Sequence, residues 1–513
     1  MNKLKSAICL LVCLIFTASA PLNFTIDIVK AQREHQWTLH GVDDRERDRY
    51  LEWERSITSF ANLFTQTHPL LANIPMTYTT FKSYIAAHEF FRSGYNALSS
   101  PHLFNIVARI RYGVVNESDS FHDPQLRNLF DQRIADLIEK IPVLEDYELY
   151  FKLHEILALV SDIHSVMDII RTPDNPTHPI RYLQFPFTFR QYNNETFIVT
   201  TLAEYDWLLG SRLIKINGVY ASDVIDLMAC IINLETRYNL PMRTMTYLTC
   251  PFALSFFGVI EDKSYVTYTF ATEDCEIFEH TSYAMPSHDF FSTELTLISP
   301  NTSNNQMLMD DFPELPFFKV FLEEYDSVYF RCRSFSNHTT FSHWTWEEMD
   351  NLFSEIVDDI IEAVVENNGI RNLIIDLRGN GGGIVSYGSI CLAEFINENR
   401  DLFGNIYIII DGRTASAAVI TSAIWVNMID DVYLIGEPAA QSPNFFYGDN
   451  TAVAISNTEF ARFVFVVSRF FSNTWPGYPY ETLMPDIHIP QTFEDFRDGR
   501  DPVLEYIKSR YVN

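Results

Sequence analysis

One serine in this chain stands where a nucleophile could act. Ser416 follows an apolar strand pattern over residues 406–410 and the turn Asp411-Gly-Arg-Thr-Ala, and Ala417 and Ala418 after it open a helical pattern. A serine at a helix start most often only caps the helix. Here the flanking small residues leave room for a substrate backbone, and the helix N-terminus favours an oxyanion. Ser416 is therefore our candidate nucleophile.

A glycine-rich turn precedes this serine in the chain. The segment Asn372-Leu-Ile-Ile-Asp376-Leu-Arg378-Gly-Asn380-Gly-Gly-Gly383 is a strand pattern that runs into three consecutive glycines. Glycine serves a tight turn after a strand in any case. The pattern departs from a dinucleotide fingerprint, because the closing glycine would have to stand at Ile384. We interpret the turn as a source of a backbone N–H for a developing oxyanion.

The elements around these two turns alternate between strand and helix. Strands are predicted over residues 328–332, 373–377, 406–410 and 432–435, and helices over residues 384–396 and 416–428. Thr345-x-x-Glu348 forms a capping box that opens a further amphipathic helix. This alternation predicts an α/β fold with a mixed, largely parallel sheet covered by helices.

The chain before this core divides into parts that differ in the spacing of their apolar residues. Apolar residues recur at helical spacing from Asp43 to about Leu157, and short strand patterns follow from about Phe185 to Phe290, including an Asn217-Gly218 turn. Residues 292–313 are rich in Ser, Asn, Thr and Pro and are predicted to form a loop. We expect four parts: a signal peptide at 1–20, a helical region at 21–180, a β-rich module at 181–291 and the α/β core at 292–513.

The N-terminus is typical of a secretory signal peptide. Met1-Asn-Lys3-Leu-Lys5 is basic, residues 7–16 are apolar, and Thr17-Ala-Ser-Ala20 offers a cleavage site. The apolar stretch is too short for a stable anchor, and no later run approaches the length of a membrane helix. We therefore expect a secreted or extracytoplasmic protein without a stable membrane span.

Charge and cysteine content exclude several classes of function. The formal net charge is -30 over 513 residues and is spread along the chain, so nucleic acid is not an expected partner. The cysteines that remain after signal removal are irregularly spaced and indicate neither a disulfide framework nor a zinc site. The sequence neither predicts nor excludes one disulfide among Cys230, Cys250 and Cys275. No signal for an oligomeric state is present.

Several segments together resemble the S41 peptidases, the family of C-terminal processing and tricorn-type serine proteases. These segments are Asp376-Leu-Arg378-Gly-Asn380-Gly-Gly-Gly383, Thr414-Ala-Ser416-Ala-Ala418, Asp162-Ile-His164-Ser165, Leu209 to Gly218, Gly436-Glu437 and Pro485-Asp486-Ile487. The resemblance covers most of residues 145–506. It implies a sheet core of ClpP/crotonase-like type, a PDZ-like module at 181–291 and a protein or peptide substrate.

The resemblance also implies the partners of Ser416. The processing-protease branch uses a lysine beyond the Gly-Glu landmark, but Ser442 stands there and no lysine occurs from Thr414 to Tyr506. The tricorn-like branch uses a histidine, which His164 matches as general base and acid. Glu481 is implied as the acid of the relay, with Glu437 as second choice. Gly382 and Ala417 are implied as the oxyanion donors, with Gly383 as a neighbouring possibility.

We expect a secreted serine endopeptidase that needs no cofactor and no metal. His88-Glu89 and His154-Glu155 lack the second histidine of a zinc protease, and Gly412 to Ser416 lacks the spacing of an esterase motif. The alternative is a catalytically inactive peptide- or ligand-binding protein on the same scaffold. Its motivation is two departures from the family pattern, Ile163 in place of Gly and Ser165 in place of Thr.

Overall fold

The structure is a computed structural model of the chain. It describes residues 43–72, 121–169, 183–293, 295–297, 307–337, 341–383, 387–447, 453–457, 462–468, 470–475 and 477–510. The predicted signal peptide lies outside these ranges. Within them, no helix has the length and apolarity needed to span a membrane. No disulfide joins any two of Cys230, Cys250 and Cys275, so the bridge left open among them is not formed.

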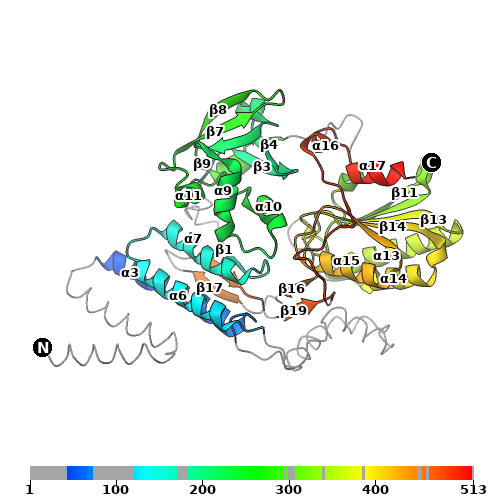
Figure 1. The fold of residues 1–513 in the computed structure, drawn as a ribbon, viewed down its shortest axis with the longest axis horizontal. Helices are drawn as coiled ribbons and strands as arrows, with labels where there is room; N and C mark the ends of the chain where they lie inside the picture. Colours follow the sequence, from blue (N-terminus) through cyan, green and yellow to red (C-terminus); the bar gives the residue numbers. More distant parts are fainter. Residues whose placement is uncertain are drawn as a thin grey trace.

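A six-stranded sheet forms the C-terminal α/β layer (Figure 1). Its strands, in spatial order, are β11 (Phe317–Leu322), β12 (Ser327–Cys332), β13 (Ile370–Asp376), β14 (Phe403–Ile410), β15 (Val432–Gly436) and β20 (Ile487–His488). Only the β11–β12 pair is antiparallel among these neighbours, which confirms the predicted largely parallel sheet. Because β13 and β14 are parallel and adjacent, the turns that follow them meet at one edge of the sheet.

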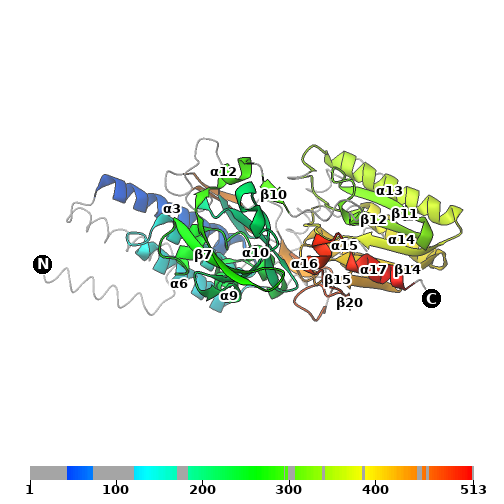
Figure 2. The ribbon, with the colours of Figure 1, turned by 90° about the horizontal axis from the view of Figure 1, so that it is seen from above.

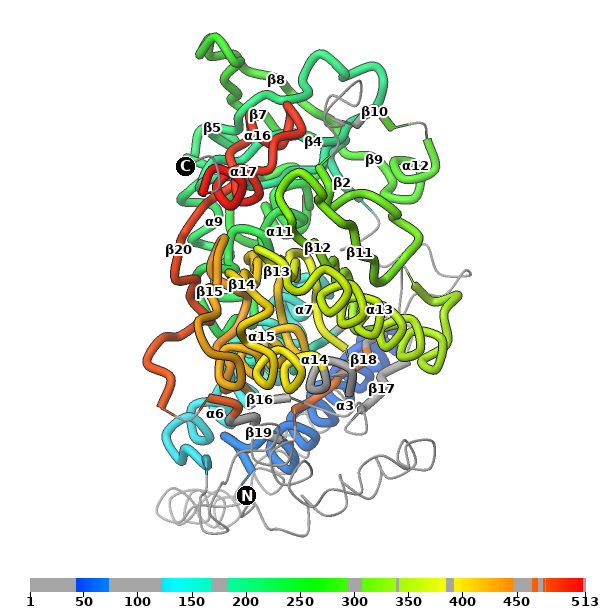
Figure 3. Tube along the Cα trace, turned by 90° about the vertical axis from the view of Figure 1, so that its right-hand side faces the viewer, coloured from blue at the N-terminus to red at the C-terminus, as the bar shows by residue number. Residues whose placement is uncertain are grey.

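Helices cover both faces of this sheet. On one face lie α13 (Trp346–Glu366), α14 (Tyr387–Glu398) and α15 (Ala417–Met428), which Figure 3 shows grouped over the parallel strands. The predicted capping box opens α13: Thr345 Oγ accepts from Glu348 N–H at 3.2 Å, and Glu348 Oε2 accepts from Thr345 N–H at 2.8 Å. On the other face α17 (Pro502–Ser509) packs through Val503, Leu504 and Ile507.

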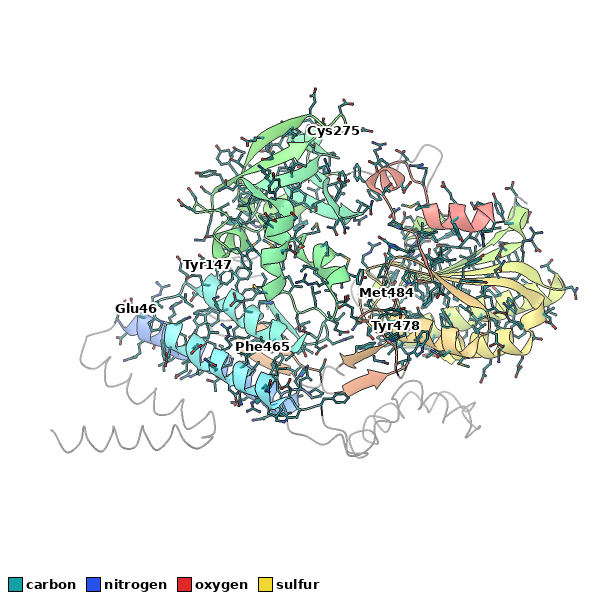
Figure 4. The ribbon with its side chains drawn as sticks, in the orientation of Figure 1. Glu46, Tyr147, Cys275, Phe465, Tyr478 and Met484 are labelled. Carbon is teal, nitrogen blue, oxygen red and sulfur yellow. The ribbon has the colours of Figure 1, made fainter. Side chains whose placement is uncertain are left out.

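The N-terminal helices pack on a small sheet to which the C-terminal segment contributes. The helices are α3 (Asp44–Thr67), α6 (Pro124–Lys140) and α7 (Asp146–Leu157). In the sheet, β1 (Val166–Ile169) is antiparallel to β18 (Arg462–Val466), and β18 also pairs with β17 (Val453–Asn457). Phe465, labelled in Figure 4, is fully buried with its ring centroid 5.2 Å from that of Phe60. The chain therefore returns to its N-terminal region after Ser416.

An antiparallel seven-stranded sheet lies beside the six-stranded one (Figure 2). Its strands are β3 (Phe187–Tyr192), β4 (Glu195–Leu202), β5 (Arg212–Ile216), β6 (Val219–Tyr220), β7 (Tyr265–Ala271), β8 (Ile277–Tyr283) and β10 (Leu295–Leu297). The predicted Asn217-Gly218 turn joins β5 to β6, with φ of 50° and 84° at its two residues. Because β10 pairs with β4, the loop predicted over residues 292–313 is wrong at residues 295–297.

Shorter elements complete the described chain. The helices are α9 (Ala221–Met228), α10 (Leu240–Thr244), α11 (Pro251–Phe256), α12 (Ser287–Ser292) and α16 (Phe493–Arg497). Two small strand pairs are β2 (Leu183–Gln184) with β9 (Met285–Pro286), and β16 (Asn444–Tyr447) with β19 (Phe470–Asn473). The β16–β19 pair matters for the site, because Phe445 of β16 lies against His164.

Candidate active site

Ser416 stands between the turn after β14 and the first residue of α15. Its φ of 53° and ψ of -123° form a combination that non-glycine residues avoid, at a cost on the order of 1–3 kcal/mol. Hydrogen bonds hold the strained turn: Ala415 N–H donates to Asn380 O at 3.0 Å, and Ser416 N–H donates to Gln441 Oε1 at 2.6 Å. A serine strained in this way at a strand-to-helix turn presents its hydroxyl for reaction.

Gly382 lies directly against this serine. A Cβ added at Gly382 would come within 2.5 Å of Ser416 Cβ and within 2.8 Å of both Ala415 O and Ala417 N. Its φ of +98° also lies in the region that favours glycine. The glycine-rich turn after β13 therefore allows the two turns to pack closely.

His164 reaches Ser416 from 252 positions earlier in the chain. Its Nε2 lies 3.0 Å from Ser416 Oγ. The imidazole stacks on Phe445, with ring centroids 5.1 Å apart and planes at 9°. Because β1 begins at Val166 and pairs with β18, the strand pairing itself carries His164 to the part of the chain that follows Ser416.

Hydrogen bonds brace the loop that carries His164. Asp162 Oδ1 accepts from His164 N–H at 2.9 Å, and Asp162 Oδ2 accepts from Ser165 Oγ at 2.5 Å. Ser165 Oγ in turn accepts from Ser468 N–H at 3.0 Å. Asn233 bonds the loop from the other side, with its Oδ1 accepting from Asp162 N–H at 2.7 Å. The loop is thus tied to two segments that follow it in the sequence, at Asn233 and at Ser468.

Three polar side chains surround the second ring nitrogen of His164. Asp162 Oδ1 lies 3.9 Å and Gln441 Nε2 lies 3.5 Å from His164 Nδ1. Gln441 is fully buried and donates from Nε2 to Glu235 Oε1 at 2.8 Å. Neither Gln441 nor Glu235 stood out in the sequence, because one loop amide and one isolated glutamate have no diagnostic spacing.

The two carboxyl groups near His164 differ in their titration. Burial raises the pKa of Asp162, but the hydrogen bond and charge of His68, with the charge of His164, outweigh burial and hold that pKa below its ordinary value. Burial raises the pKa of Glu235 well above its ordinary value, and the charge of Asp162 adds to this shift. Asp162 is therefore the carboxyl group that stays ionised near neutral pH.

His164 and the two carboxyl groups near it are a set that could hold a metal ion. Ligand atoms of Asp162, His164 and Glu235 lie within 4.8 Å of one another. A metal on His164 Nδ1 would leave the ring proton on Nε2, so the histidine could not then accept a proton from Ser416. These residues could therefore hold a metal ion or supply a base for Ser416, but not both at the same time.

Glu481 does not lie at His164. It is exposed, and within the described ranges it forms no hydrogen bond or ion pair with the imidazole. The next residues, Thr482 and Leu483, are fully buried, and Leu483 N–H donates to Gln441 O at 2.8 Å. This anchoring leaves Glu481 at the surface. The contact predicted for Glu481 is absent from this structure, and Asp162 is the ionised group nearest the ring.

The predicted oxyanion donors need a similar correction. Gly382 N–H donates to Asn380 Oδ1 at 2.9 Å, so this N–H is already engaged and the prediction that it faces an oxyanion is wrong for this conformation. Ala417 occupies the first position of α15, where a backbone N–H has no acceptor within its own helix. Gly383 forms a parallel bridge to Phe335. Ala417 and Gly383 stay predictions.

Comparison with known proteins gives distant structural matches. No protein-family model and no curated protein matches the chain. It is similar to mature CPAF, with 12% identity, 80% of this chain and 95% of that chain covered, and a TM-score of 0.46. It is also similar to the photosystem II D1 C-terminal processing protease, with 11% identity, 78% and 97% of the two chains covered, and a TM-score of 0.30. The function proposed below therefore rests on the site itself.

The Asp376-Leu-Arg378 motif forms a buried, hydrogen-bonded group at the end of β13. Arg378 Nη2 donates to Asp376 Oδ2 at 2.6 Å and to Asp501 Oδ2 at 2.7 Å, and all three side chains are buried. Tyr329 adds a hydroxyl bond to Asp376 at 2.7 Å. Burial would raise the pKa of Asp376, but the charges of Arg378 and Arg331 hold it well below its ordinary value. These groups fix the turn that leads to Gly382.

Glu437, the second choice for the relay acid, lies in a different charged group. Burial raises the pKa of Glu437 to about 7, and the charge of Asp411 adds to the shift against the opposing charges of Arg413 and Arg378. Its acidic and basic neighbours therefore belong to the turns after β13 and β14. The structure gives Glu437 no contact with His164 among the described residues.

The raised pKa of Glu437 predicts a pH-dependent stability. A carboxyl group with a folded-state pKa of about 7 and an unfolded-state pKa of about 4.3 binds its proton more tightly when folded. Its stabilising contribution is complete below the unfolded-state pKa and is lost as the pH rises through the folded-state pKa. As the pH rises from 5 to 8, the free energy of unfolding of Glu437→Gln should therefore increase relative to that of the wild type by on the order of 2–3 kcal/mol.

Urea unfolding at both pH values measures this difference. Glu481→Gln is the matched control, because it makes the same change of side chain at an exposed position. The same pH dependence in wild type and Glu437→Gln would contradict the role given to Glu437.

Proposed function

We propose that this protein hydrolyses peptide bonds as a serine peptidase of the S41 type. The observation that carries the proposal is the 3.0 Å contact between His164 Nε2 and Ser416 Oγ. Two sequence segments that resemble one family's catalytic motifs thus meet in space, and the serine of the pair has the strained backbone of an exposed nucleophile. Export of the protein and a peptide-receiving role for the seven-stranded sheet are proposed from the sequence alone.

The proposed reaction follows from the geometry. Ser416 Oγ attacks the scissile carbonyl carbon as His164 Nε2 accepts the hydroxyl proton, and the same proton then passes to the leaving amine. A water molecule hydrolyses the acyl-enzyme through the same base. Asp162, ionised and 3.9 Å from Nδ1, stabilises the imidazolium in the role expected of Glu481. The N-terminus of α15, with Ala417 N–H, stabilises the oxyanion.

A serine-directed fluorophosphonate probe tests this proposal directly. Labelling at Ser416 that disappears in His164→Ala supports a hydrolase, because only an activated serine attacks phosphorus at a useful rate. A folded wild-type protein that resists the probe would instead favour the alternative, an inactive peptide- or ligand-binding protein. Circular dichroism of both proteins establishes that they are folded.

The close packing of Gly382 on Ser416 yields a second test. Gly382→Ala should lower kcat/KM for a peptide substrate by about 10²-fold, because the added methyl group must displace Ser416, and misplacement by about 1 Å has an effect of this size. Gly381→Ala is the matched control, since a Cβ there meets nothing within 4 Å. Steady-state kinetics of the two variants decide the question. Equal losses in both would refute a specific role for Gly382.

A further inference from the structure

The side chain of Gln441 connects the two halves of the proposed catalytic pair. Its Oε1 accepts from Ser416 N–H at 2.6 Å. A backbone N–H can only donate, so this bond determines which end of the amide is oxygen. Nε2 then lies 2.8 Å from Glu235 Oε1 and donates to it. The amide is fully buried, which excludes solvent as a competing partner.

The second hydrogen on Gln441 Nε2 faces the imidazole. Nε2 lies 3.5 Å from His164 Nδ1. A neutral imidazole carries its proton on one nitrogen and a lone pair on the other. Approach of an amide donor to Nδ1 favours the form in which Nδ1 holds the lone pair and Nε2 holds the proton. In that form Nε2 donates to Ser416 Oγ and cannot accept the serine proton.

We propose that Gln441 is a positioning residue that holds His164 in the tautomer with its proton on Nε2, and that the site works after this amide turns away from Nδ1. On release the Nε2 proton passes to solvent and another proton binds Nδ1, so the ring stays neutral. Asp162 Oδ1, 3.9 Å from Nδ1, is then the acceptor for the new N–H. The His164 side chain is 21% exposed, which gives solvent access to the ring.

The same movement frees a backbone donor at the nucleophile. While Gln441 Oε1 accepts from Ser416 N–H, that N–H cannot bind a developing oxyanion. A substrate carbonyl that takes this N–H in place of Gln441 would therefore release the amide and the imidazole together. Substrate binding and base activation are coupled by one side chain. This consequence for rate rests on the proposed function, whereas the tautomer of His164 does not.

Nitrogen NMR of the full-length chain labelled with ¹⁵N-histidine reads the tautomer directly. The His164 signals are those missing from His164→Ala, and the wild type should show the proton on Nε2. The decisive variant combines Glu235→Gln with Gln441→Glu, which keeps the charge and size of the pair and reverses its hydrogen bond. A carboxylate at position 441 still accepts from Ser416 N–H and also accepts from Nδ1. The ring proton should move to Nδ1, and kcat should rise by about tenfold or more.

Two further variants make the result specific. Glu235→Gln alone retains the amide donor at Gln441 and should leave the ring proton on Nε2. Gln441→Met removes the donor without adding an acceptor, should abolish the Nε2 preference, and decides the matter if the double variant does not fold. A wild-type ring already protonated on Nδ1, or a double variant still protonated on Nε2, would overturn the inference. If Ser416 is not a nucleophile, the tautomer changes persist and only the rate change is lost.

Discussion

Ser416→Ala is expected to lower kcat for peptide hydrolysis by about 10⁴-fold or more, because it removes the only atom that can form the acyl-enzyme in the proposed reaction. The fold should be retained. Alanine keeps the Cβ of serine, so the cost of the φ of 53° and ψ of -123° is the same in both proteins. Kinetics with a fluorogenic peptide, together with urea unfolding, measure the two quantities separately.

His164 should behave as part of the same unit. His164→Ala is expected to cost a similar factor, and the double variant should lose little more than either single variant, since neither group works without the other. Ser422→Ala is the matched control: Ser422 lies on α15, which begins directly after Ser416, and it is buried and donates to Ala418 O at 2.8 Å. Undiminished hydrolysis by folded Ser416→Ala, or losses that add in the double variant, would contradict the Ser/His assignment.

Arg378→Met is expected to lower the free energy of unfolding by about 3–5 kcal/mol, which is the usual effect of leaving buried charges without their partner. Methionine fills much of the volume but supplies no hydrogen bonds to Asp376 and Asp501, both buried. The turn before Gly382 should loosen, so activity should fall with stability. Denaturant unfolding followed by fluorescence measures the change.

A surface ion pair supplies the control for this prediction. Arg497 pairs with Glu273 through side chains that are 32% and 77% exposed, so Arg497→Met should cost about 0–1 kcal/mol. Comparable destabilisation by the two substitutions would show that the buried ion pairs of Arg378 contribute no more to stability than the exposed pair of Arg497.

The pH dependence of stability provides a second test of the ion pairs that Arg378 forms with Asp376 and Asp501. Because the folded-state pKa of Asp376 is depressed, its contribution is complete above the unfolded-state value of about 3.9 and is lost as the pH falls below it. In Arg378→Met the carboxyl group loses its main positive partner, so its folded-state pKa rises. The variant should therefore lose less stability than the wild type between pH 5 and pH 3, and an unchanged slope would argue against the network.

Much of the α/β core was predictable from the sequence, because its signals are local. The strand, turn and helix around Ser416 follow from apolar runs, small residues and glycines that lie next to one another in the chain. The Thr345 and Glu348 capping box formed as predicted for the same reason, since both partners belong to one helix turn. The short strand β10 was missed, because three residues carry too little periodicity to outweigh a loop-like composition.

The sequence by itself determined the types of residue that carry the proposed chemistry and the strand ends on which Ser416 and the glycines stand. Resemblance alone singled out His164. Only the tertiary structure decided what surrounds the imidazole, where Asp162, Gln441 and Glu235 gather and Glu481 does not. The physical reason is that periodicity records which face of an element is buried, whereas these contacts depend on the pairing of β1 with β18 and on hydrogen bonds between loops far apart in the chain.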